Sequence, residues 1–144
     1  MTTAADILIV DDHLSLQMLL TLIVEGAGYR GVTANNGQDA LTYLHASANL
    51  PGLILLDVAM PIMTGWDFLR AQQQDVRLAT IPVVLMTALS HFDHEEAAAN
   101  VVAYLKKPIV LDALEALVHA QYQPQLKTKA VGTEVSVLRE ATSN

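Results

Sequence analysis

The stretch that decides the fold runs from residue 53 to residue 69 and reads LILLDVAMPIMTGWDFL. Leu53–Leu56 form a continuous apolar run that is too short for a helix and is typical of a strand buried on both faces. The run leads into one carboxylate, Asp57, and a loop containing Pro61 then leads to Gly65, after which a helix is predicted. The pattern therefore predicts a strand–loop–helix unit with an acidic side chain at the carboxyl end of the strand.

Strand-type and helix-type segments alternate along the rest of the chain. Short apolar or β-branched runs predict the strands, and longer runs with helical spacing predict the helices, one of which has Asn36 as its N-cap. The predicted strands are residues 7–10, 31–34, 53–56, 81–87 and 102–105, and the predicted helices are residues 14–25, 38–46, 65 onward, 95–99 and 111–121. This alternation predicts an α/β fold, a doubly wound (βα)5 sandwich with helices on both faces of a parallel five-stranded sheet.

The composition is that of a globular domain. The chain has 144 residues, of which 52% are apolar and 16% charged, and its formal net charge is −7. This negative charge argues against direct binding to nucleic acid or to an anionic membrane. The absence of cysteine excludes disulfides and thiolate metal sites.

The pattern along the chain predicts one domain followed by a tail. We expect a compact domain over residues 5–121 and a tail over residues 122–144 that is too short for a second domain. In the tail, the segment AVGTEVSVLREAT (130–142) is compatible with a strand or helix added to a dimer and with disorder. No signal peptide and no membrane-spanning run is recognised, so we expect a cytoplasmic protein.

Polar side chains stand at the carboxyl ends of the predicted strands. Asp11 and Asp12 follow the first strand, Asp57 follows the third, Thr87 ends the fourth and Lys107 follows the fifth. Parallel strands present these ends at one edge of the sheet, where open α/β sheets bind ligands. Neighbouring carboxylates repel one another unless a cation lies between them, and Mg²⁺ suits a site with few carboxylates and room for water. A carboxylate beside Mg²⁺ can attack a phosphoryl group.

The motifs at these strand ends resemble the receiver domain of two-component response regulators. The resemblance covers about residues 5–121 and rests on the acidic pair after the first strand, DVAMPIMTG (57–65), MTA (86–88) and YLKKP (104–108). Each motif by itself is compatible with a turn, a helix cap or a solvated charge, whereas their joint occurrence at one sheet edge is not. The resemblance implies a flavodoxin-like sheet with strand order 2-1-3-4-5 and a stand-alone regulator.

The resemblance also implies a role for each site residue. Asp57 would be the phosphoacceptor, and Thr87 and Lys107 would bind oxygens of the phosphoryl group. Tyr104 would turn inward when Thr87 moves toward the phosphate, so that these two residues form the switch. The implied Mg²⁺ ligands are Asp11, Asp12, Asp57 and the backbone carbonyl of Ala59, and the Lys107–Pro108 peptide bond is expected to be cis.

The implied function is a phosphorylation-activated signalling switch. It would accept a phosphoryl group from a sensor histidine kinase or a phosphotransfer protein and signal through contact with a protein effector. Formation of a dimer on phosphorylation stays open. It would catalyse only its own phosphotransfer and a slow self-dephosphorylation, because neither Ala59 nor Leu89 can position a water.

Two alternative functions stay open. One is a phosphorylation-independent interaction domain. The other is a Mg²⁺-dependent aspartate phosphatase, against which Ala59 argues, because that chemistry uses a second aspartate two residues after the nucleophile.

The helix predicted over residues 14–25 has more apolar residues than a core face needs. The core face is predicted to consist of Leu16, Leu19, Leu20, Ile23 and Val24, and beside it runs a polar stripe of Gln17, Thr21 and Glu25. A second apolar ridge consists of Leu14, Met18 and Leu22. We interpret this ridge as the docking surface for the kinase or phosphotransfer partner, as the first helix is in similar receivers.

Overall fold

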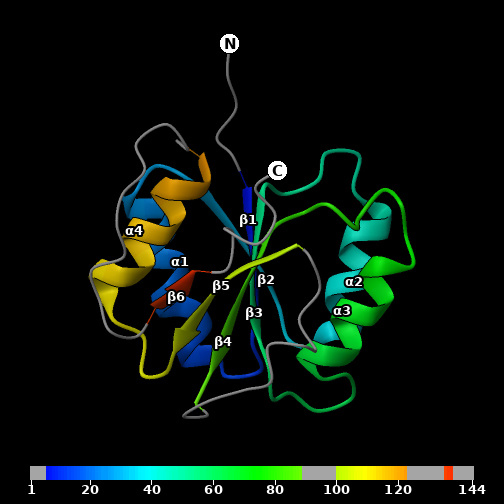
Figure 1. Cartoon of the computed structure of the whole chain (residues 1–144), viewed down its shortest axis with the longest axis horizontal. Coiled ribbons are helices and arrows are strands. Elements are labelled where there is room, and N and C mark those ends of the chain that lie inside the picture. The colour runs from blue at the N-terminus through cyan, green and yellow to red at the C-terminus, as the bar shows by residue number, and fades with distance from the viewer. Residues whose placement is uncertain (1–5, 89–99, 123–134, 138–144) are drawn as a thin grey trace.

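The computed structural model describes residues 6–88, 100–122 and 135–137, which form a sheet with helices on both sides (Figure 1). The strands are β1 (Asp6–Val10), β2 (Arg30–Ala34), β3 (Leu53–Asp57), β4 (Val83–Thr87), β5 (Val101–Lys106) and β6 (Val135–Val137). The helices are α1 (Leu14–Gly26), α2 (Gly37–Ala46), α3 (Gly65–Gln73) and α4 (Leu111–Tyr122). The helix predicted over residues 95–99 lies outside the described residues.

The sheet confirms the predicted topology and extends it. The strand order is β2-β1-β3-β4-β5-β6, and the first five strands are parallel. The sixth strand comes from the tail and pairs antiparallel with β5, so the sheet has one strand more than the five predicted. β4 begins at Val83 rather than at residue 81, because Pro82 has no N–H to contribute to a ladder.

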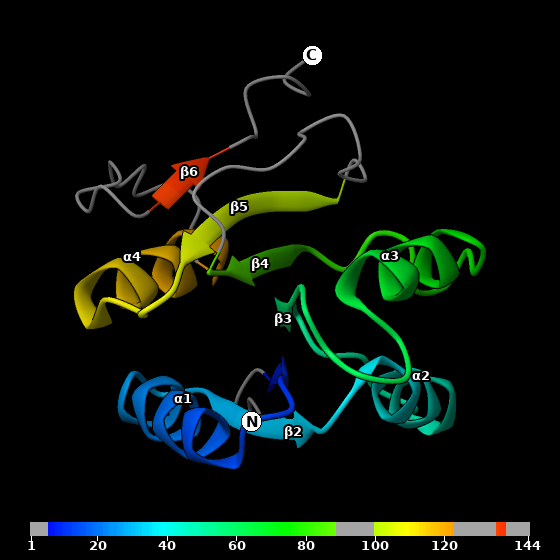
Figure 2. The same cartoon turned by 90° about the horizontal axis from the view of Figure 1, so that it is seen from below.

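Two apolar layers hold the helices against the sheet. Helices α1 and α4 cover one face, and α2 and α3 cover the other (Figures 1 and 2). Successive residues of β1 serve opposite layers, because side chains alternate along a strand: Ile9 packs on the α1/α4 side and Leu8 on the α2/α3 side. All five residues of β3 are buried, which explains the uninterrupted apolar run that precedes Asp57.

Helix α1 differs from its predicted pattern at two positions. Leu20 and Val24 are fully buried as expected, but Leu19 is 48% exposed, so its placement on the core face was wrong. Gln17, which was assigned to the polar stripe, is only 4% exposed. The second ridge is exposed as expected, with Leu14, Met18 and Leu22 at 67%, 60% and 70%.

The loop from β3 to α3 folds tightly back on the end of β3. Thr64 caps α3 by accepting from the Asp67 N–H, and the Asp67 side chain accepts in return from the Thr64 N–H. The N–H of Gly65 donates to the Val58 carbonyl at 2.8 Å. A Cβ at Gly65 would lie 2.6 Å from the Asp57 carbonyl oxygen, so only glycine fits here without a shift of the backbone.

Within residues 6–88 and 100–122, no helix is long and apolar enough to cross a lipid bilayer.

The N-cap predicted at Asn36 is confirmed, since its side chain accepts a 2.9 Å hydrogen bond from the Asp39 N–H.

Candidate functional site

The carboxyl ends of β1, β3 and β4 bring three polar side chains into the interior. Asp11 is 0% exposed, Asp57 3% and Thr87 2%. β3 and β4 are parallel neighbours in which Asp57 pairs with Met86, the residue before Thr87. The Lys107 N–H donates to the Thr87 carbonyl at 2.7 Å, which places the residue after β5 beside the end of β4. The strand-end residues singled out from the sequence therefore lie together.

Lys107 connects two of the carboxylates. Its Nζ lies 3.0 Å from Asp11 Oδ2 and 3.1 Å from Asp57 Oδ1, and its side chain is 19% exposed. Lys106 is exposed, as expected for a solvated charge. One ammonium group thus pairs with two buried carboxylates. The summed formal charge of Lys107, Asp11 and Asp57 is negative, and Asp12 adds a further negative charge.

The Asp57 carboxyl has a raised pKa. Burial is the largest cause, and the charge of Asp11 acts in the same direction, while the Lys107 ammonium opposes both through its charge and its hydrogen bond. The second oxygen, Asp57 Oδ2, is buried and has no hydrogen-bond partner. A carboxylate in this position is incompletely neutralised by the protein itself, which favours binding of an additional cation.

The Lys107 ammonium has a raised pKa. Its partial burial lowers the pKa, but the hydrogen bond to Asp11 and the negative charges of Asp57 and Asp11 outweigh that effect. Lys107 is therefore held in its charged form at neutral pH, as an electrostatic partner for an anion would have to be.

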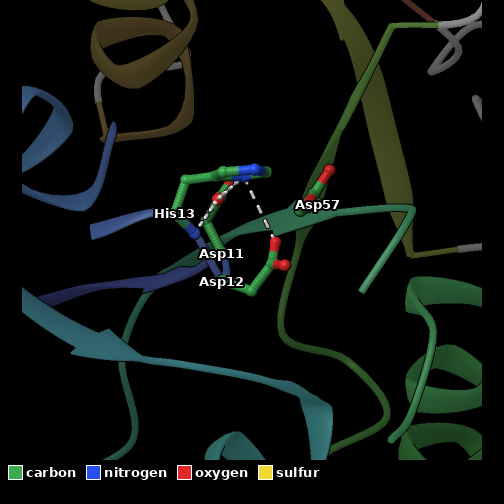
Figure 3. A group of neighbouring side chains, drawn as sticks. All are labelled: Asp11, Asp12, His13 and Asp57. Carbon is green, nitrogen blue, oxygen red and sulfur yellow. Dashed lines mark hydrogen bonds and ion pairs between the residues drawn. The ribbon is translucent and has the colours of Figure 1, made fainter. Parts of the chain in front are cut away.

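The acidic group at the ends of β1 and β3 fits a hard divalent cation. Asp11, Asp12, His13 and Asp57 each offer one ligand atom, and these atoms lie within 4.8 Å of one another (Figure 3). Carboxylate oxygens at this spacing suit Mg²⁺, which binds through few protein ligands and keeps several waters. The partnerless Asp57 Oδ2 is consistent with such an ion. Ala59 is exposed in the loop that follows β3.

Two residues near the site had no role assigned to them from the sequence: His13, which follows the acidic pair, and Gln17, which was placed on the polar stripe. His13 Nδ1 lies 3.3 Å from both Asp11 Oδ1 and Asp12 Oδ1, and the His13 N–H donates to Asp11 Oδ1 at 2.8 Å. The buried Gln17 Nε2 donates to the Asp11 carbonyl at 2.6 Å and to Asn35 Oδ1 at 2.8 Å. Gln17 thus holds the backbone of the acidic pair in place. Its spacing along the helix matches a solvated polar stripe and gives no sign of this role.

The predicted switch residues lie in adjacent strands. Tyr104 in β5 pairs with Leu85 in β4, two residues before Thr87. Tyr104 is 2% exposed and packs in the apolar layer on the α2/α3 side, so its side chain lies inside the protein, while its role in a switch stays a prediction. The Lys107–Pro108 peptide bond is cis, as expected.

Comparison with known proteins finds a matching family and several relatives of this chain. The family model described as "Response regulator receiver domain" matches residues 7–119. The chemotaxis protein CheY of Pseudomonas aeruginosa is 38% identical over 112 residues, which are 76% of this chain and 89% of that protein. The DNA-binding transcriptional regulator NtrC of Escherichia coli is 33% identical over 141 residues, which are 92% of this chain but 29% of that protein.

The relatives differ in how much of their length this chain spans. It spans 61% of the response regulator Rre1 of Synechocystis and 29% of NtrC. The resemblance therefore concerns only part of the length of those two proteins.

Solved structures show the same fold. The chemotaxis protein CheY4 of Vibrio cholerae has a TM-score of 0.74 at 27% identity, covering 81% of this chain and 98% of that one. The signal receiver domain of a histidine kinase from Syntrophus aciditrophicus has a TM-score of 0.72 at 30% identity, covering 90% and 98%. With its parallel strands in the order 2-1-3-4-5 and an acidic cluster at their carboxyl ends, this chain belongs to the response regulator receiver domain family.

Proposed function

We propose that this chain is a phosphorylation-activated switch that accepts a phosphoryl group on Asp57 from a histidine kinase or a phosphotransfer protein. One observation carries the proposal: Asp57 is buried beside Lys107, with one oxygen paired to the ammonium and the other without a hydrogen-bond partner. In the step, a carboxylate oxygen of Asp57 forms a bond to phosphorus while the phosphorus–nitrogen bond of a phosphohistidine breaks. The imidazole leaves with the bonding electron pair and takes up a proton.

The neighbouring residues would share the charge of the transferred group. Lys107, held in its charged form, would pair with one phosphoryl oxygen, and the Thr87 hydroxyl would donate to another. Asp11, Asp12, Asp57 and the Ala59 carbonyl would hold Mg²⁺, which when bound supplies charge neutralisation on the phosphoryl oxygens. Gln17 would keep the Asp11 backbone in place through its 2.6 Å hydrogen bond.

The signal would pass from the site to a protein surface through Thr87 and Tyr104. We propose that the phosphoryl group stabilises the arrangement in which Tyr104 is buried, by drawing Thr87 toward Asp57. Because this buried arrangement is already present in the structure, phosphorylation would act by shifting a population rather than by creating a new conformation. The switch would act in the cytoplasm by contact with a protein effector, without direct binding to nucleic acid and without membrane insertion. A phosphorylation-linked dimer is one form that this contact could take.

The test of this function is intact mass after incubation with acetyl phosphate, with Mg²⁺ or with a chelator. We expect one phosphoryl adduct that forms with Mg²⁺ and is nearly absent without it. We also expect the adduct to last far longer than seconds, because the methyl group of Ala59 has no polar atom to position a water. Leu89, the other residue that is unable to position a water, lies outside the described residues. A folded chain that takes up no phosphoryl group would instead support the phosphorylation-independent interaction domain, and rapid turnover would support the phosphatase.

The exposed ridge of α1 is the proposed docking surface for the phosphoryl donor. Leu14, Met18 and Leu22 are each at least 60% exposed, and α1 begins two residues after the acidic pair of the site. An apolar ridge in this place fits a helical partner that presents its phosphohistidine to Asp57.

Charge on this ridge is expected to block transfer without affecting the chemistry. Met18→Glu with Leu22→Glu should slow transfer from a phosphorylated histidine kinase about tenfold or more, the size expected when apolar contacts at an interface centre are lost. The rate of phosphorylation by acetyl phosphate should not change. Val76→Glu is the control, since Val76 is 92% exposed in the loop before β4. An unchanged rate of transfer from a kinase that phosphorylates the wild type would rule out the ridge as the docking surface.

A further inference from the structure

The tail of the chain supplies a strand to the free edge of the sheet. β6 pairs antiparallel with β5, with Ala103 opposite Val137, Tyr104 opposite Ser136 and Leu105 opposite Val135. Figure 2 shows β6 beside β5 at the end of the sheet, beyond β4. Without β6, the outer edge of β5 would present unpaired N–H and C=O groups, which readily accept another strand.

The pairing falls on the part of β5 that carries the switch. On its other side β5 pairs with β4, where Tyr104 lies opposite Leu85 and Lys106 lies opposite Thr87. The backbone around Tyr104 is therefore held between two strands, one of which comes from the tail. In this doubly paired state the Tyr104 side chain is buried at 2% exposure.

The contact of β6 has the properties of a reversible one. A strand of three residues forms few ladder hydrogen bonds, so it opens at a lower free energy than the inner strands of a sheet. Residues 123–134 keep β6 tethered to α4, so β6 returns to the edge at a high effective concentration after each opening. A weak, tethered contact of this kind responds to small changes in the strand that it binds.

We propose that β6 is an intramolecular ligand of β5 whose binding favours the buried arrangement of Tyr104 and thereby favours phosphorylation of Asp57. The inference rests on the proposed function, because it assigns the tail to the same switch. A ligand shifts a conformational equilibrium only by its difference in affinity for the two states, and β6 is seen paired with the buried one. Coupling is reciprocal, so a phosphoryl group on Asp57 should in turn strengthen the β6 contact.

The test uses the full chain with Val135→Pro and Ser136→Pro. Successive N–H groups of a strand point to opposite sides, so one of the two prolines removes an N–H that faces β5, whichever residues supply the donors. The matched control is Ala130→Pro with Val131→Pro, outside β6. The probe is beryllium fluoride with Mg²⁺, which mimics a phosphoryl group on a carboxylate. Hydrogen exchange of those N–H groups of residues 103–105 that face β6, rather than β4, reports the β5 edge.

We expect the β6 variant to bind beryllium fluoride about fivefold more weakly than the wild type, within the usual range of coupling between sites. The control variant should bind like the wild type, and beryllium fluoride should slow exchange at residues 103–105 in the wild type. Equal or tighter binding by the β6 variant, with its β5 edge shown to exchange freely, would overturn the coupling while leaving the proposed function in place. Loss of binding by all three chains would instead overturn the proposed function, and the coupling with it.

Discussion

Asp57→Asn is expected to abolish the phosphoryl adduct that acetyl phosphate forms on the wild-type chain. The amide has nearly the shape of the carboxylate, and its oxygen can still accept from Lys107, so the site should keep its geometry. It lacks the carboxylate nucleophile that forms the bond to phosphorus. Intact mass in the presence of Mg²⁺ measures the result. Asp75→Asn is the matched control, because the Asp75 carboxylate pairs with His45 rather than with the site.

The same variant has an expected effect on stability that does not depend on phosphorylation. Because the pKa of Asp57 is raised by burial, the folded chain retains the proton to a higher pH than the unfolded chain. The stability contributed by this group therefore declines as pH rises from its ordinary pKa through the raised one. Asp57→Asn removes that decline.

With a chelator present, Asp57→Asn should melt at a higher temperature than the wild type at neutral pH. The difference should narrow as the pH is lowered to about 4, near the ordinary pKa of an aspartate. Thermal melts of the two chains across this range measure it. If the wild type were as stable as Asp57→Asn at neutral pH, or more stable, Lys107 would fully neutralise Asp57. For the adduct prediction, a phosphoryl adduct on Asp57→Asn would show that another residue is the phosphoacceptor.

Gly65→Ala is expected to destabilise the chain by about 2–3 kcal/mol, the usual cost of overpacking against atoms that cannot move aside. The added Cβ would lie 2.6 Å from the Asp57 carbonyl oxygen and 2.9 Å from the Val58 Cα, both of which are backbone atoms. The melting temperature should fall by about 5–10 °C for a chain of this size. Because the displaced backbone is that of Asp57 itself, phosphorylation by acetyl phosphate should slow as well.

Gly26→Ala is the matched control for this substitution. Gly26 is the last residue of α1, and a Cβ there would meet nothing within 4 Å. Alanine in that position should be neutral or stabilising by up to about 1 kcal/mol, since glycine is the weaker helix former. If Gly65→Ala melted within a degree or two of Gly26→Ala, the close approach of the β3–α3 loop to the end of β3 would not be a constraint on this fold.

The local pattern of the sequence determined the parallel sheet and the place of the site. The apolar runs around Leu8, Leu55 and Leu85 are buried on both faces, and a strand of that kind is recognisable because every residue must be apolar. Once these strands are parallel, the residues that end them must share one edge, so Asp11, Asp57 and the neighbourhood of Thr87 were predictable as one group. The position of Gly65 at the start of a helix followed from the same unit.

The tertiary structure alone decided which polar groups touch. Gln17 lies on α1 at a spacing typical of a solvated stripe, yet its side chain is buried because the Asp11 carbonyl and Asn35 lie within its reach. Lys107 pairs with Asp11 across 96 positions of sequence, a contact that no local pattern encodes. The same holds for β6, since a three-residue segment is compatible with many partners and only the unpaired edge of β5 selects this one. Sequence periodicity reports which face of an element is apolar, whereas contacts between polar groups depend on distances that exist only after the layers have packed.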